Sequence, residues 1–229
     1  MQDYSYVKEN FTALSDEIRS YGQKYGREIT LVSVTKSGTD DELLALCGFG
    51  ATDIGENRPQ ELVRRGELIK NGGFDVRLHE IGSLQRNKVK YIIQDVALIH
   101  SLDSIALAEE IEKQATKAGR TVPVLIEVNS GREENKGGVM PEEVEQFAKE
   151  ISRFEHLVLS GLMTMGPVCE DAEGSRQYFR LTKNLFDDLL DKGYFKENAI
   201  LSMGMSDSYR VAIEEGSTLV RVGRMLFRK

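Results

Sequence analysis

The segment Ile29-Thr-Leu-Val-Ser-Val-Thr35 and the segment from Asp40 to Cys47 together show the pattern on which the whole chain is built. The first is a short apolar run of the kind that forms a buried strand. The second is typical of a helix, with Thr39 or Asp40 placed to cap its start and Gly48 placed to end it. These segments predict one strand–helix unit, with Lys36 in the connection between its two elements.

The same alternation extends in both directions from this unit. Residues 4–25 carry apolar side chains at spacings of three and four, which predict a preceding helix. Further strands are expected at residues 53–56, 77–81, 97–101, 122–128, 159–163, 200–203 and 219–222. Helices are expected between them, near residues 59–70, 86–94, 104–118, 141–154, 174–192 and 207–215.

Strands that alternate with helices predict an α/β fold with parallel strands and right-handed crossovers. Eight such units in 229 residues match a single (β/α)8 TIM barrel with an extra N-terminal helix, so one domain is expected over residues 1–229. An open doubly wound sheet is the alternative, although open sheets of this size usually have fewer strands. In a barrel, functional residues lie at the carboxyl ends of the strands.

The composition excludes several classes of function. The net charge of −7 argues against nucleic acid as a partner, because binding to its phosphate backbone requires a basic face. Cys47 and Cys169 share no metal-ligand spacing and are expected to be reduced thiols. No apolar run approaches the length of a membrane span, and the N-terminus lacks the pattern of a signal peptide. We therefore expect a cytoplasmic protein without a membrane partner.

Lys36 follows the first predicted strand and is the sharpest candidate at the barrel mouth. Partial burial there would lower the pKa of its ammonium group. A neutral amine can attack an aldehyde to form a Schiff base. The alternative is a lysine that extends from the strand end into solvent.

The last two predicted strands suggest a phosphate site. Ser206 is placed to cap a helix that begins at Asp207, and Gly223 would let a ligand approach the backbone. Barrels often bind phosphate with the loops after strands seven and eight. A phosphate site and a lysine at one mouth fit either a phosphosugar in a lysine-dependent aldolase or pyridoxal phosphate (PLP).

Arg221 helps to separate these two ligands. It lies two residues before Gly223, on the same face of the last strand. From there its guanidinium could reach the ring nitrogen of PLP and keep that nitrogen unprotonated, which makes the ring a poor electron sink. The alternative is a core arginine paired with Glu56 or Glu127.

Taken together, the sequence resembles the pyridoxal phosphate homeostasis proteins, single-domain relatives of the alanine racemase N-terminal barrel, over essentially its whole length. The segments that carry the resemblance are Val32-Ser-Val-Thr-Lys36, Gly55-Glu-Asn57, Gln60-Glu-Leu62, His79-Glu-Ile-Gly-Ser-Leu-Gln85, Asn87-Lys88, Gly161-Leu-Met-Thr164, Ser202-Met-Gly-Met-Ser206 and Gly216-Ser-Thr-Leu-Val-Arg-Val-Gly223. The His79 and Ser202 segments are the most specific of these.

The resemblance implies that Lys36 holds PLP as a Schiff base and that Arg221 faces the pyridine nitrogen. It implies phosphate contacts from Ser206, Gly223 and the backbone of Arg224. The residues that would flank the ring are Asn57, Ser202, Met203 and Gly204. His79 is a further candidate at the cofactor, as an acid or base, although a strand-end histidine more commonly packs or forms a hydrogen bond.

The function that the resemblance implies is vitamin B6 homeostasis inside the cell. Family members carry or buffer PLP without robust catalysis, which makes PLP-dependent apoenzymes the candidate recipients. The racemases have a further C-terminal domain that supplies a catalytic tyrosine, and nothing after the last strand would build it here. A monomer is therefore expected, with a weak racemase and an aldolase as the competing functions.

Several positions depart from the family pattern or stay open. Gly38 stands where the family has a second lysine, Ser208 stands where it has an acid, and Arg224 stands where it often has threonine. Lys136 matches a family lysine and could receive the cofactor, although a solvated loop is the simpler interpretation. His100 and His156 have no histidine or carboxylate partner at metal-ligand spacing, so no metal site is expected.

Overall fold

The structure is a computed structural model that describes residues 3–196 and 198–229. Its strands are β1 Thr30–Val34, β2 Asp53–Glu56, β3 Arg77–Glu80, β4 Val96–Leu102, β5 Val122–Glu127, β6 Leu157–Met163, β7 Ile200–Ser202 and β8 Leu219–Val222. Its α-helices are α1 Ser5–Tyr25, α2 Asp40–Gly48, α3 Pro59–Asn71, α4 Arg86–Ile92, α5 Ile105–Ala118, α6 Val144–Ile151, α7 Arg176–Asp191 and α8 Tyr209–Glu214. Two 3-10 turns, Pro141–Glu143 and Glu173–Ser175, precede α6 and α7.

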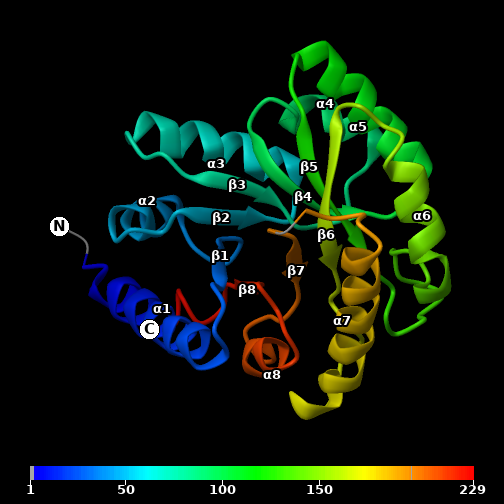
Figure 1. Ribbon diagram of the computed structural model, residues 1–229. Helices are drawn as coiled ribbons and strands as arrows, with labels where there is room; N and C mark the ends of the chain where they lie inside the picture. Colours follow the sequence, from blue (N-terminus) through cyan, green and yellow to red (C-terminus); the bar gives the residue numbers. More distant parts are fainter. Residues whose placement is uncertain (1–2, 197) are drawn as a thin grey trace.

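The eight strands form a closed parallel barrel in sequence order, with helices around it (Figure 1). Strand β1 pairs with both β2 and β8, and the β8 register runs from Thr30 opposite Leu219 to Ser33 opposite Val222. This pairing closes the sheet. The predicted TIM barrel is confirmed, and the open-sheet alternative is wrong.

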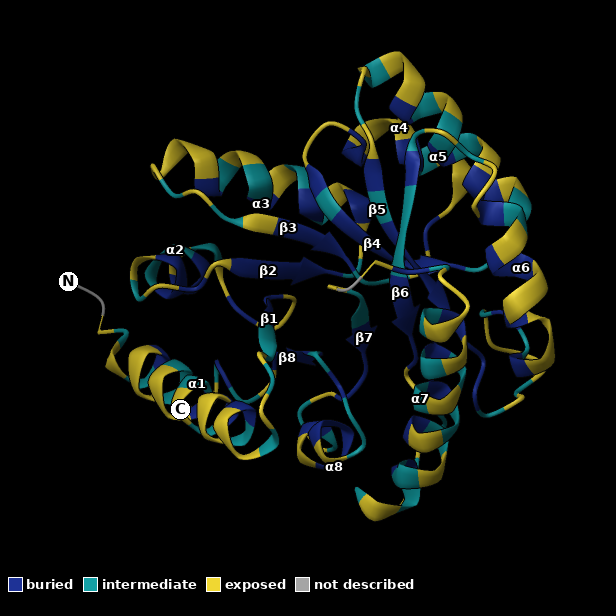
Figure 2. Cartoon of the chain, viewed as in Figure 1, coloured by how far each residue is buried: buried dark blue, intermediate teal, exposed yellow. Residues whose placement is uncertain are grey.

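The barrel buries two separate apolar layers. A small inner cluster contains Val32, Leu98, Leu125, Met163 and Leu219, one residue from each of five strands. The larger layer lies between the sheet and the helices, so the strands are mostly dark blue in Figure 2 while the helices are exposed on their outer faces. The inner cluster is small, and buried polar side chains occupy much of the remaining interior.

A capping box starts α2 directly after the Lys36 connection. Thr39 Oγ1 accepts a hydrogen bond of 3.3 Å from the Glu42 backbone N–H, and the Glu42 carboxylate accepts one of 2.6 Å from the Thr39 backbone N–H. This reciprocal pair satisfies two donors that would otherwise be unpaired at the helix start. It also sets the length of the loop that contains Lys36.

The predicted start of the last helix is wrong. Helix α8 begins at Tyr209, two residues later than expected, and Ser206 does not cap it. Residues 206–208 instead form a turn in which the Ser208 N–H donates to the Met205 carbonyl at 2.9 Å. The Ser208 hydroxyl accepts from the Met205 N–H at 3.3 Å, so a local side-chain bond competes with the helix. In the described ranges, no helix combines the length and the apolar character needed to cross a bilayer.

Candidate functional site

Lys36 lies in a tight turn two residues beyond the end of β1. The Gly38 N–H donates to the Thr35 carbonyl at 2.9 Å and closes this turn. The Lys36 side chain is exposed, not partly buried as the sequence suggested. The reason is that β1 stops at Val34, so the lysine sits on the rim of the barrel.

A cavity of about 390 Å³ places Lys36 next to Asn57, at the carboxyl ends of β1 and β2. Its lining residues are Lys36, Ser37, Glu56, Asn57, Arg58, Glu61 and Arg65. Asn57 is half-buried, while Glu56 and Arg65 are buried behind the turn. The structure thus brings together two of the residues predicted to hold the cofactor.

Ser206 and Gly223 meet just beyond the end of β8, where β8 lies against β1. The Gly223 N–H points at Ser206 Oγ at 3.5 Å, at the edge of hydrogen-bonding distance. A Cβ on Gly223 would lie 2.7 Å from the Val34 carbonyl oxygen, closer than a side chain can approach. Glycine is therefore required for β8 to end against β1, and the predicted phosphate residues lie beside the strand that leads to Lys36.

Arg224 extends from this corner as an exposed side chain. It forms an ion pair with Asp207, and both side chains are more than half exposed. The pair joins the loop after β7 to the segment after β8. The positive charge of Arg224 is therefore shared with a neighbouring acid.

Arg221 points into the barrel and is almost fully buried. It donates to Ser202 Oγ at 2.5 Å and to the Thr164 carbonyl at 3.2 Å. Burial lowers the pKa of Arg221 to about 10, although the nearby Glu127 carboxylate acts in the opposite direction. The guanidinium remains charged near neutral pH, and its hydrogen bonds in the described chain do not go to Glu56 or Glu127.

Two interior histidines continue from Ser202. His100 Nδ1 lies 3.0 Å from Ser202 Oγ, and His100 Nε2 lies 3.0 Å from His79 Nδ1. His79 Nε2 in turn lies 2.8 Å from Asp53 Oδ1. Burial holds the pKa of His100 well below its usual value, and the charges of His79 and Arg221 lower it further. His79 therefore lies within a buried polar network and not on the open rim.

His100 and His156 each contact one ionisable side chain that is far away in the sequence. His100 contacts His79, as above, and His156 Nδ1 lies 2.9 Å from the Glu112 carboxylate. These partners come from other strands and helices, so spacing along the sequence does not reveal them. Within residues 3–196 and 198–229, no group of three His, Cys, Asp or Glu side chains is placed to hold a metal ion.

Met203 and Gly204 take different positions from each other. Met203 is fully buried and packs in the outer core between the sheet and the helices, so its side chain does not line the barrel interior. The Gly204 carbonyl accepts a hydrogen bond of 3.1 Å from the Arg221 backbone N–H. Of the Ser202–Gly204 segment, Ser202 alone directs a side chain to Arg221.

Glu127 is a buried carboxyl group, which the sequence suggested only as an ion-pair partner for Arg221. It is buried and lines a cavity of about 220 Å³ at the ends of β3, β5 and β6. Burial and the neighbouring Asp103 raise the pKa of Glu127 to about 7, against the lowering effect of Arg221. Lys136 lines the same cavity, where it forms an ion pair of 2.6 Å with Glu133. An alternating inward-facing pattern along β5 could have identified Glu127.

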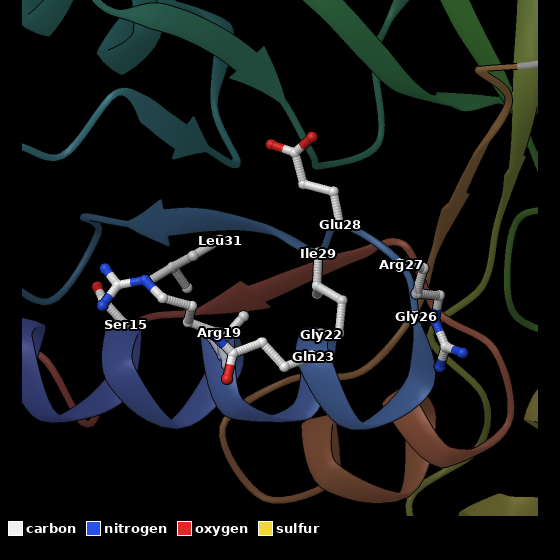
Figure 3. Close-up of a pocket in the computed structure, with 10 residues that line it drawn as sticks. Ser15, Arg19, Gly22, Gln23, Gly26, Arg27, Glu28, Ile29 and Leu31 are labelled. Carbon is white, nitrogen blue, oxygen red and sulfur yellow. The ribbon is translucent and has the colours of Figure 1, made fainter.

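A larger cavity of about 570 Å³ lies away from this mouth, between α1 and the start of β1 (Figure 3). Arg19 and Gln23 of α1 and Arg27 of the α1–β1 connection are among its lining residues. It contains none of the residues predicted to bind the cofactor. The predicted cofactor residues Lys36, Asn57, Ser206 and Gly223 lie instead beyond the carboxyl ends of β1, β2, β7 and β8, the end of a barrel at which functional sites are expected.

Comparison with known proteins agrees with this geometry. The family model for the alanine racemase N-terminal domain matches residues 10–228. The chain is 40% identical over 222 residues to the pyridoxal phosphate homeostasis protein of Aquifex aeolicus, which covers 96% of each sequence.

The chain belongs to the pyridoxal phosphate homeostasis protein family. The member from Helicobacter pylori is 35% identical over 233 residues and covers 100% of both sequences. The structure of PipY from Synechococcus elongatus with PLP bound superposes with a TM-score of 0.85 at 25% identity, covering 97% of this chain and 100% of that one. The family resemblance and the barrel of alanine racemase type are both confirmed.

Proposed function

We propose that residues 1–229 act as one PLP-binding unit, which holds PLP as a Schiff base on Lys36 and carries or buffers it inside the cell. The observation that supports this proposal best is the meeting of three features around the end of β1. Lys36 follows β1, Gly223 rests against Val34 of β1, and Arg221 occupies the barrel interior on the adjoining strand. PLP is a flat phosphorylated aldehyde. Its aldehyde group matches Lys36, its phosphate matches Gly223, and its ring nitrogen matches Arg221.

The corner formed by Ser206 and Gly223 fits a phosphate group. The Ser206 hydroxyl and the Gly223 N–H face each other without a short bond, so both have donors to offer an anion. The backbone N–H of Arg224 follows directly. Glycine lets a phosphate approach the main chain closely, and backbone N–H groups are good anion donors.

Arg221 fits the nitrogen side of the ring. The PLP aldehyde supplies the electrophile that a lysine amine can attack. A charged guanidinium can only donate hydrogen bonds, so opposite a pyridine nitrogen it favours the unprotonated ring. Asn57, in the same cavity as Lys36, would contact the ring edge. This arrangement holds the cofactor while keeping it a weak electron sink.

We propose further that the protein retains PLP without robust turnover. An enzyme of this type needs an acid or base aligned with the reacting carbon. Among the described residues, Glu127 has a pKa of about 7, which suits an acid or base near neutral pH. Glu127 therefore favours a residual racemase-like activity as the second candidate function. We propose that the carrier role dominates, in a monomer that passes PLP to PLP-dependent apoenzymes.

The visible spectrum of purified protein, before and after borohydride reduction, tests the proposal. We expect a Schiff-base band, and a reduced adduct on the peptide that contains Lys36. Lys36→Ala should abolish the adduct, and Lys136→Ala serves as the matched control because it changes a lysine of the same mouth. A colourless protein that takes up no PLP, or an adduct on another lysine, contradicts the proposal. Rapid interconversion of D- and L-amino acids would instead favour the enzyme.

A further inference from the structure

Five buried side chains form a continuous series of hydrogen bonds through the barrel. The distances are 2.8 Å from Asp53 Oδ1 to His79 Nε2, 3.0 Å from His79 Nδ1 to His100 Nε2, 3.0 Å from His100 Nδ1 to Ser202 Oγ, and 2.5 Å from Ser202 Oγ to Arg221 Nη1. Each residue is at most 4% exposed. We call this series the interior chain.

The two ends of the interior chain have fixed roles. A guanidinium only donates hydrogen bonds, so Ser202 Oγ must accept from Arg221. Burial would raise the pKa of Asp53, but hydrogen bonds from His79, Arg77 and Thr52 outweigh it and hold that pKa below its usual value. Asp53 is therefore ionised, and an ionised carboxylate only accepts.

With two neutral rings, these ends leave one arrangement of the hydrogens between them. His79 Nε2 donates to Asp53, and His79 Nδ1 accepts from His100 Nε2. His100 Nδ1 then accepts the hydrogen of Ser202, so that all four bonds are satisfied. The strongly lowered pKa of His100 agrees with the neutral form of that ring.

We propose that Asp53, His79, His100 and Ser202 are positioning residues, which form a one-directional hydrogen-bond chain that holds the guanidinium of Arg221 in place for the pyridine nitrogen. The inference rests on the proposed function for the identity of the ligand. Ser202 gives its hydrogen to His100 and keeps its lone pairs for Arg221. Because each group polarises the next, the ionised Asp53 strengthens the acceptor that Arg221 contacts.

The interior chain also connects the two ends of the barrel. Asp53 is the first residue of β2, and its second oxygen accepts a hydrogen bond of 2.8 Å from Arg77, whose side chain is 64% exposed. Ser202 is the last residue of β7. A substitution at the closed end of the barrel should therefore alter binding at the open end, without any contact between that residue and the ligand.

The first test uses the unloaded protein and ¹⁵N NMR of labelled histidine. We expect both His79 and His100 to carry hydrogen on Nε2 alone. Asp53→Asn removes the charge at this end of the interior chain, while its amide oxygen can still accept from His79 Nε2, so this variant should weaken PLP binding without moving the hydrogens. A wild-type spectrum with hydrogen on Nδ1 of either ring would overturn the proposal.

The second test compares PLP with its 1-deaza analogue, in which carbon replaces the ring nitrogen. Ser202→Ala should weaken PLP binding about tenfold, the size expected for one charge-assisted hydrogen bond, and change binding of the analogue by less than about twofold. Ser101→Ala is the matched control, since Ser101 is also a buried strand serine and its hydroxyl has no partner among the described residues. Equal loss for both ligands would show general damage to the barrel and would overturn the proposal.

The two tests separate this inference from the function on which it rests. If the wild-type protein takes up no PLP, the proposed function fails, while the NMR result still decides whether the interior chain is directional. If PLP binds but Ser202→Ala does not discriminate between the ligands, the positioning role fails alone. Asp53→Asn and Ser202→Ala alter the interior chain near its two opposite ends, so one variant that folds is enough for the test.

Discussion

Arg65 and Glu56 form a buried ion pair of 2.8 Å directly behind the turn that carries Lys36. The same guanidinium donates to the carbonyls of Thr35 at 2.5 Å and Gly38 at 2.8 Å, the residues that flank the lysine turn. One side chain of α3 therefore holds both ends of the loop that follows β1. This contact explains how an exposed lysine is kept at a defined place on the barrel rim.

Arg65→Ala should destabilise the protein by about 3–5 kcal/mol, because it leaves Glu56 buried without its charge partner. The neighbouring Arg64 is about half exposed and pairs with Asp40 and Glu61, so Arg64→Ala should cost at most about 1 kcal/mol. Urea unfolding of both variants measures the difference. A cost for Arg65→Ala no larger than that for Arg64→Ala would show that the buried pair does not stabilise the turn.

Gly223→Ala should weaken binding of PLP about tenfold or more and leave binding of pyridoxal, which lacks the phosphate, almost unchanged. The added Cβ would lie 2.7 Å from the Val34 oxygen, so the end of β8 has to move away from β1 and from the phosphate corner. Gly48→Ala is the control, because its Cβ would meet Phe74 at 3.7 Å, an ordinary contact. Equal loss of both ligands would place the phosphate elsewhere.

Gly38→Lys, which introduces the lysine that the resemblance implies at this position, should destabilise this chain by about 1–3 kcal/mol. The Phe227 ring occupies the space, since a Cβ at position 38 would lie 2.6 Å from it. The double variant with Phe227→Ala should recover part of the lost stability, and thermal unfolding of the single and double variants tests this. If the two substitutions are simply additive, the ring is not what excludes the lysine.

Glu80→Gln should stabilise the protein at pH 8.5 and have little effect at pH 5. Burial raises the pKa of Glu80 to about 8, although the Gly82 N–H opposes this effect. A folded-state pKa above the unfolded value of about 4.3 means that stability falls as the pH rises from about 4 to 8. The Gln variant lacks this decline. Melting temperatures across this range measure it, with exposed Glu67→Gln as the control, and parallel curves for Glu80→Gln and wild type would contradict it.

The sequence predicts the fold well because every strand and helix carries its own local signal. Lys36 and Gly223 stand at strand ends, where the barrel fold directs attention. The interior chain is different, because His100 of β4 and Ser202 of β7 lie on strands that are not neighbours and meet only across the closed barrel. The turn at residues 206–208 is also not predictable in this way, since a serine before a helix is equally suited to capping and to a local turn.

The pairing of β1 with β8 has a consequence for folding kinetics. Thr30 and Leu219 are partners across the closing seam, although they come from opposite ends of the chain. Contacts between distant parts of a chain form slowly, because a long loop must close before the contact is made. Lys36 and Gly223 follow the two strands of this seam, so their relative placement depends on the strand pairing with the greatest separation in sequence. Capture of PLP during refolding should therefore report the closure of the barrel, after most of the helices have already formed.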